Sequence, residues 1–203
     1  MRTRRPTPLI LAVAVLLIPF VYLRSCSRSH APTPHPEYLY NFKEGNPMSF
    51  TLTSPAFPNG GEIPRHYTCD DADVSPDLAW SEAPAATQSL ALIVDDPDAS
   101  VGIWTHWLIW NIPPKATVLP SDTPRVPLLD NAARQGLNDF KRIGYGGPCP
   151  APGKPHRYFF KLYALDARLD LKPGATKAEL EAAIKPHLLA QTQYVGLYQR
   201  GTP

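Results

Sequence analysis

Two histidines, an aspartate and a tyrosine stand at the ends of apolar segments, and their spacing could bring them together. Asp96 follows one apolar run, His106 opens the next, and His156 and Tyr158 open a third. Side chains alternate along a strand, so His156 and Tyr158 share a face. If the first two runs pair as antiparallel strands, Asp96 lies near His106, and a third strand entering from the same end adds His156.

These side chains suit a small anion such as phosphate. Imidazoles that are protonated or donate a hydrogen bond would face the anion, and the acid would orient them. A loop at 142–155, rich in glycine and proline, could add backbone N–H donors. Three other interpretations stay open: structural histidines, a simple turn at DPD (96–98), and a zinc site, although no closely spaced histidine pair supports zinc.

Nucleophilic catalysis has less support in the sequence. The chain contains no Gly-x-Ser-x-Gly segment. Cys149 could act as a nucleophile beside His156, but it lies between Pro148 and Pro150. In an exported protein that setting favours a disulfide instead.

The elements that must position these residues are mostly strands. Proline accounts for 25 of the 203 residues, well above its usual share of ~5%, and it breaks helix interiors. The proline content therefore argues against an all-helical bundle. Continuous apolar runs at 89–95, 106–112 and 158–165 predict buried strands, and alternation at 49–53 predicts a first strand.

One strong helical pattern occurs late in the sequence, at 177–189. Its apolar residues recur on one face, Thr176 is placed to cap its start, and Glu179 completes a capping box. Long loops at 96–105 and 142–155 each lead into a histidine, and long loops in compact domains are often functional. The sequence thus predicts a mostly antiparallel sheet protein with one C-terminal helix.

The N-terminal segment differs from the rest in charge. Residues 1–30 contain five arginines and no acid, whereas the whole chain has a net charge of +2. The remaining residues therefore sum to −3, which gives no general attraction to nucleic acid. Three of the arginines precede an apolar run at 9–23, a pattern typical of a secretory signal or membrane anchor. A buried core helix is the alternative that the arginine cluster opposes.

This pattern divides the chain into a signal or anchor segment at 1–25, a Pro-rich tether at 26–47 and a folded domain at 48–203. It predicts export, with the domain in the periplasm and tethered to the membrane by residues 9–23 or by a lipidated Cys26. LRSC (23–26) is similar to a lipidation site, except for its arginine. Simple cleavage of the leader is the third possibility.

Several short motifs in the sequence resemble those of one known protein family. DPDA (96–99), WTHW (104–107) and GKPHRY (153–158) resemble the signature regions of the phosphatidylethanolamine-binding protein family. YTCD (67–70), SPDLAW (75–80) and GYGGPCP (144–150) resemble its bacterial branch, called Raf kinase inhibitor-like. The resemblance extends over 48–199. One departure is Ser100, where the family usually has a second proline.

The resemblance implies an antiparallel β-sandwich with an anion pocket at one end. By motif match, the pocket residues would be Asp96, Asp98, Trp104, His106, Gly147, Pro150, His156 and Tyr158. A disulfide between Cys69 and Cys149, which lie in loops beside the bacterial motifs, is also expected. No cofactor, metal or catalytic residue is implied.

Three functions are compatible with this resemblance. The first is non-catalytic binding of phosphate-bearing small molecules or phospholipid head groups. The second is an inhibitor or protein-interaction module, of the kinase- or protease-inhibitor kind, with a vestigial pocket and an unknown protein partner. The third is a hydrolase that uses Asp96, His106 and His156. The sequence leaves the natural ligand unspecified.

Overall fold

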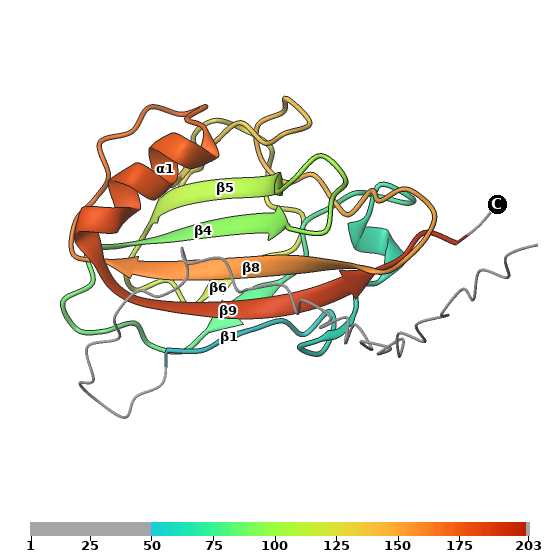
Figure 1. Cartoon of the computed structure of the whole chain (residues 1–203). Helices are drawn as coiled ribbons and strands as arrows, with labels where there is room; N and C mark the ends of the chain where they lie inside the picture. The colour runs from blue at the N-terminus through green and yellow to red at the C-terminus, as the bar shows by residue number, and fades with distance from the viewer. Residues whose placement is uncertain (1–49, 202–203) are drawn as a thin grey trace, which may run out of the picture. The chain divides into compact units, whose positions relative to one another are not determined.

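Two sheets and a single α-helix make up the part of the chain that the structure, a computed structural model, describes: residues 50–201 (Figure 1). The strands are β1 (Leu52–Thr53), β2 (Gly61–Glu62), β3 (Leu78–Trp80), β4 (Ser89–Asp96), β5 (Trp104–Ile112), β6 (Val118–Leu119), β7 (Arg134–Gln135), β8 (His156–Leu165) and β9 (Leu188–Tyr198). The α-helix is α1 (Lys177–Ile184), and short 3-10 turns are η2 (Arg65–Tyr67) and η3 (Lys185–His187). The predicted β-rich fold with one C-terminal helix is confirmed.

The larger sheet has the order β2-β9-β8-β4-β5-β7, and the smaller one has the order β1-β3-β6. Every pairing is antiparallel except that of β2 with β9. The segments predicted at 1–25 and 26–47, including Cys26, lie outside the described residues. Among residues 50–201, no helix has the length and apolar character needed to cross a membrane.

The central strand β4 is buried along its whole length because both of its faces are covered. Leu90, Leu92 and Val94 belong to the core between the two sheets. Ala91 and Ile93 belong to a second core on the opposite face, which α1 covers with its own buried side chains (Figure 1). Burial on both faces explains why the sequence of β4 is continuously apolar instead of alternating.

The α-helix begins where the sequence predicts and ends earlier. Thr176 accepts a hydrogen bond from the Glu179 N–H, and the Glu179 side chain accepts one from Thr176, so the capping box forms. The predicted helix at 177–189 stops at Ile184, because Pro186 cannot continue a helix. After the turn η3 the chain enters β9, an 11-residue strand that the sequence reasoning did not predict.

The other predicted strands shift at their ends. The strand predicted at 49–53 is observed only over Leu52–Thr53, within the described residues. β5 begins at Trp104 and β8 begins at His156, so each strand begins two residues earlier than predicted. Five of the predicted site residues therefore lie inside strands, where backbone pairing fixes their positions: Asp96, Trp104, His106, His156 and Tyr158.

Candidate functional site

The pairing of three strands brings the predicted polar residues to one end of the larger sheet. β4 is antiparallel to both β5 and β8, so the end of β4 lies beside the beginnings of its two neighbours. Asp96 is paired with Trp104, and Asp95 is paired with Phe159. The first two apolar runs thus pair as antiparallel strands, and the third enters from the same end, which is the arrangement that would bring Asp96, His106 and His156 together.

Asp96 and His156 form the first polar contact of the site. The His156 Nδ1 lies 2.7 Å from Asp96 Oδ2, and the two side chains are 19% and 4% exposed. The second Asp96 oxygen accepts a hydrogen bond from the Asp98 N–H at 2.8 Å. Because a carboxylate only accepts, the His156 Nδ1 carries the proton, and Nε2 is the ring nitrogen that remains for a ligand.

His106 is held by backbone instead of by an acid. Its Nδ1 donates to the Gly146 carbonyl at 2.6 Å, and the Gly146 N–H donates back to the His106 carbonyl at 2.9 Å. Burial lowers the pKa of His106, and the Gly146 carbonyl and the charge of Asp96 oppose this effect. The prediction that Asp96 orients one histidine thus has a specific form in the structure: it contacts His156, and Gly146 holds His106.

A β-bulge decides which way His106 faces. Val94 pairs with Trp107 while Asp95 pairs with Thr105, so β5 has one extra residue at His106. Strict alternation along β5 would predict that His106, Leu108 and Trp110 share one face, and because of the bulge that prediction is wrong. Leu108 and Trp110 pack in the core under α1, whereas His106 meets Tyr158, a residue of the core between the sheets.

Aromatic rings surround His106. Its ring is edge-on to Tyr158 at 5.1 Å and to Phe140 at 5.3 Å, and Trp104 meets Phe140 at 5.3 Å. Two buried polar atoms of this cluster, Trp104 Nε1 and the Tyr158 hydroxyl, have no hydrogen-bond partner among residues 50–201. Burial raises the pKa of Tyr158, and the Asp96 carboxylate adds to the rise through its charge and as an acceptor near the hydroxyl, so the hydroxyl stays protonated and able to donate. Buried donors of this kind are rare and require an explanation.

Asp98 is paired with a cation that the sequence reasoning did not include in the site. Its carboxylate accepts from the Arg157 Nε at 2.8 Å, from the guanidinium NH2 group at 2.7 Å and from the Arg157 backbone N–H at 3.0 Å. This contact holds the pKa of Asp98 below its usual value. Arg157 lies within the GKPHRY motif, so the signal was present in the sequence.

A shallow hollow of about 440 Å³ adjoins His156. It is lined by Asp98, Lys154, Pro155, His156 and Arg157. Trp104, His106 and Tyr158 do not line this hollow, so His156 is the residue that belongs both to the hollow and to the contact with Asp96. Within residues 50–201, no three histidine, cysteine or acidic side chains are grouped so as to hold a metal ion.

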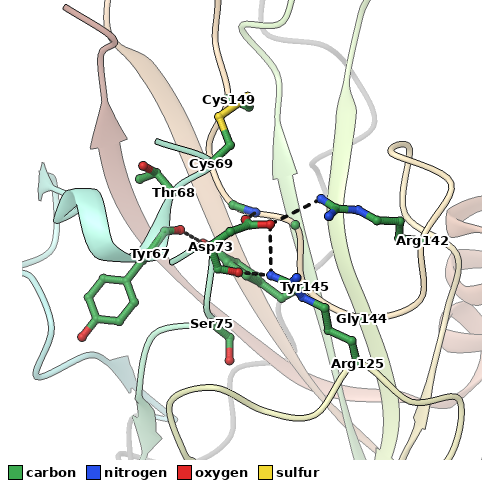
Figure 2. A network of polar contacts seen from close by, with 12 residues as sticks. Tyr67, Thr68, Cys69, Asp73, Ser75, Arg125, Arg142, Gly144, Tyr145 and Cys149 are labelled. Carbon is green, nitrogen blue, oxygen red and sulfur yellow. Dashed lines mark hydrogen bonds and ion pairs between the residues drawn. A yellow bond between two sulfur atoms is a disulfide. The ribbon is translucent and has the colours of Figure 1, made fainter. Parts of the chain in front are cut away.

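The loop that carries Gly146 is fastened to the segment before β3. Cys69 and Cys149 form a disulfide with their Cα atoms 5.4 Å apart, and the Cys69 N–H donates to the Pro148 carbonyl. The hydroxyl of the buried Tyr145 donates to the Tyr67 carbonyl at 2.8 Å (Figure 2). The resemblance to a known family implied this cysteine pair, which holds the backbone against which His106 is placed.

Asp73 completes this attachment, and no sequence motif pointed to it. Figure 2 shows its carboxylate between two arginines: Arg125 lies 3.0 Å and Arg142 3.5 Å from the same oxygen. The other oxygen accepts from the Gly147 N–H at 2.6 Å. A Cβ on Gly147 would lie 2.4 Å from the Tyr67 carbonyl oxygen, so this position requires glycine.

Two of the predicted pocket residues, Gly147 and Pro150, belong to the loop that the disulfide and Asp73 hold in place. Gly147 uses its N–H on Asp73, so that N–H is engaged within the protein. Pro150 is buried directly after Cys149, in the loop that the disulfide holds. The other six predicted residues lie at or just beyond the end of the sheet where β4 ends and where β5 and β8 begin. Direct contacts join Asp96 to His156, and His106 to Tyr158.

Comparison with known proteins matches the sequence of this chain to one family. The family model described as phosphatidylethanolamine-binding protein matches residues 53–199. A UPF0098 protein of Methanothermobacter thermautotrophicus is 49% identical over 150 residues, which cover 74% of this chain and 99% of that protein. A UPF0098 protein of Aquifex aeolicus is 48% identical over 149 residues, 72% of this chain and 86% of that protein.

Solved structures show the same fold. A phosphatidylethanolamine-binding protein homologue from Chlamydia trachomatis superposes with a TM-score of 0.69 at 39% identity, covering 75% of this chain and 98% of that one. YbcL of E. coli, described as a member of the mammalian family, gives a TM-score of 0.69 at 33% identity and covers 74% and 98% of the two chains.

Proposed function

Because this chain belongs to the phosphatidylethanolamine-binding protein family, we propose that it binds phosphate-bearing small molecules or phosphorylated head groups without turning them over. The family and the fold support a binding or regulatory role of this general kind. The observation that carries the finer proposal is that two buried donors, Trp104 Nε1 and the Tyr158 hydroxyl, have no hydrogen-bond partner among residues 50–201, and that the Tyr158 ring contacts His106. A tetrahedral anion has enough acceptor oxygens to satisfy both.

The histidines determine when the site accepts a negative charge. Both Nδ1 atoms face acceptors, so in the neutral rings each Nε2 carries a lone pair and would repel an anion. Each ring must gain a proton at Nε2 before it can donate to the ligand. Burial lowers the pKa of His106, and a bound anion would oppose that effect by stabilising the charged ring. Ligand binding should therefore be coupled to proton uptake.

This coupling predicts that affinity depends on pH. Binding of inorganic phosphate or phosphorylethanolamine should strengthen as the pH falls from about 8 to about 6, where imidazoles gain protons. Calorimetry in buffers of different ionisation enthalpy would measure the affinity and the proton uptake together. Binding without proton uptake would contradict the proposed role of the histidines.

Variants separate a binding pocket from a structural cluster. His156→Ala removes one charged donor, a loss of about 1.5–3 kcal/mol, which is roughly ten- to a hundred-fold in affinity. Trp104→Phe and Tyr158→Phe delete one donor each while keeping a ring. If the pocket binds no anion, these changes remove an unsatisfied group and should only stabilise the fold. His187→Ala is the control, since His187 pairs with Asp166 at an exposed site.

An interaction module is the second candidate. Val101 and Ile103, on the loop between β4 and β5, are 75% and 48% exposed, and exposed apolar groups often mark contact surfaces. On this hypothesis a protein partner would be lost on Val101→Ser with Ile103→Ser and retained in His156→Ala. The pocket hypothesis makes the opposite prediction for phosphate.

A further inference from the structure

The charges around the hollow point to the class of ligand, if the proposed function holds. His156 belongs both to the phosphate site proposed above and to the hollow lined by Asp98, Lys154 and Arg157. A phosphate ester with its phosphate at His156 would therefore extend its remaining atoms into the hollow. The charges of the lining residues then decide which substituent is accepted there.

Both acids near the hollow are already paired within the protein. Asp96 uses one oxygen on His156 and the other on the Asp98 N–H. Asp98 uses both oxygens on the Arg157 guanidinium, in the two-point geometry that makes arginine–carboxylate pairs strong. An ammonium group entering the hollow would have to displace Arg157 to reach a carboxylate.

Lys154 is the lining residue whose charge is not compensated. Among residues 50–201 it makes no ion pair or side-chain hydrogen bond, and it is exposed. Its position is nevertheless defined: Pro155 restricts its backbone to extended conformations, and Gln199 donates to the carbonyl of Gly153 just before it. Its ammonium group can therefore reach a ligand that occupies the hollow.

We propose that this site selects phosphate esters whose substituent carries a negative charge over esters that carry an ammonium group, and that Lys154 is the residue that sets this preference. Lys154 attracts a carboxylate and repels an ammonium group, while the paired Asp98 offers the ammonium group nothing in return. Because Lys154 is exposed, the preference is modest: about fivefold, as expected for a solvent-screened charge pair.

Calorimetry on the full chain tests this with two esters of similar size, phosphoglycolate and phosphorylethanolamine, and with inorganic phosphate. We expect phosphoglycolate to bind about fivefold tighter than phosphorylethanolamine at low salt, and the difference to shrink with added salt. Lys154→Gln should abolish the preference and Lys154→Arg should keep it. Lys185→Gln, an exposed lysine on η3, is the matched control.

The outcomes distinguish this inference from the function on which it rests. Inorganic phosphate binding with equal affinities for the two esters, or tighter binding of phosphorylethanolamine, overturns the charge preference alone. No binding of any of the three probes overturns both. Vesicles of phosphatidylserine and phosphatidylethanolamine form the lipid arm: a preference for phosphatidylserine that is lost in Lys154→Gln supports the same charge selection with a lipid as its source.

Discussion

Asp95 and Asp96 are neighbours in β4, yet they lie on opposite faces of the sheet and have different partners. Asp95 is 1% exposed and accepts from the ammonium groups of Lys161 at 3.0 Å and Lys177 at 2.9 Å, which joins β4 to β8 and to α1. Asp96 is paired with His156. Because successive side chains of a strand point to opposite faces, two identical neighbouring residues meet different partners.

The difference lies in the kind of cation that each acid meets. Lysine is charged throughout the physiological pH range, so the contacts of Asp95 are permanent and serve the fold. The imidazole beside Asp96 differs in kind from an ammonium group, because it has a neutral as well as a charged form. If the proposed anion site lies on the Asp96 face, changes to Asp95 should affect stability and changes to Asp96 should affect binding.

The largest expected effect comes from the covalent link on the pocket face. Replacing Cys69 and Cys149 by serine removes a cross-link between residues 80 apart, which should lower the free energy of unfolding by about 4 kcal/mol in the chain-entropy model. Phosphate affinity should fall as well, because the same loop carries Gly146, which holds His106. Urea denaturation and calorimetry measure the two effects. Unchanged affinity would mean that Asp73 and Tyr145 hold the loop without the disulfide.

Asp95→Asn acts on the helix-covered face and should affect stability alone. Removing one member of a buried ion pair leaves the cations poorly compensated, and we expect a loss of about 3 kcal/mol in the free energy of unfolding. Phosphate affinity should stay within twofold of the wild type, roughly 0.4 kcal/mol. Asp166→Asn is the control, because Asp166 pairs with His187 at the surface, and it should cost less than about 1 kcal/mol. A large loss of affinity in Asp95→Asn would break the separation of the two faces.

Asp96→Asn should produce the reverse result. The amide oxygen can still accept from the His156 Nδ1, so the ring keeps its place, but the charged ring loses its counter-ion. We expect phosphate affinity to fall about tenfold, or roughly 1.4 kcal/mol, with a smaller change in the free energy of unfolding. A fall in stability equal to that of Asp95→Asn, with affinity unchanged, would show that both acids are structural.

The smallest effect concerns His106 and pH. Because burial lowers its pKa, the unfolded chain takes up the proton first, near the ordinary value of 6.5. The stability contributed by neutral His106 is thus present above that pH and is lost as the pH falls below it, by at most about 1.4 kcal/mol per pH unit. Urea denaturation should show a shallower decline below pH 6.5 in His106→Gln. Saturating phosphate should reduce the decline in the wild type, and a decline that phosphate leaves unchanged would count against an anion at His106.

The strands of the core were predictable because their apolar runs are long and unbroken. β4, β5 and β8 follow directly from these runs, and the capping box at Thr176 located the start of α1. β9 was missed because the first half of LLAQTQYVGLY (188–198) has no buried residue, and buried residues alternate only from Tyr194 onward. Its role depends on pairing with β8, which a local pattern does not reveal.

The part of the candidate site that depends on the positions of strand ends could be predicted from the sequence. Antiparallel pairing places Asp96 beside His156, but the bulge that turns His106 toward Tyr158 depends on a register shift without a sequence signal. The contact of Asp73 with Gly147 joins residues 74 positions apart. Such contacts follow from the packing of loops on one another, for which side-chain periodicity carries no information.

The parallel pairing of β2 with β9 also determines when this edge of the sheet can fold. Gly61 lies opposite Gly196. A Cβ on Gly196 would lie only 2.4 Å from the Ile63 Cγ1, so the two segments pack too closely for a side chain at this position. This edge of the sheet therefore requires residues from both ends of the described chain, and β2 has no other strand partner among them. Contacts so distant in sequence slow folding, to times on the order of milliseconds to seconds. A chain still emerging from the ribosome would keep that edge open until β9 had been synthesised.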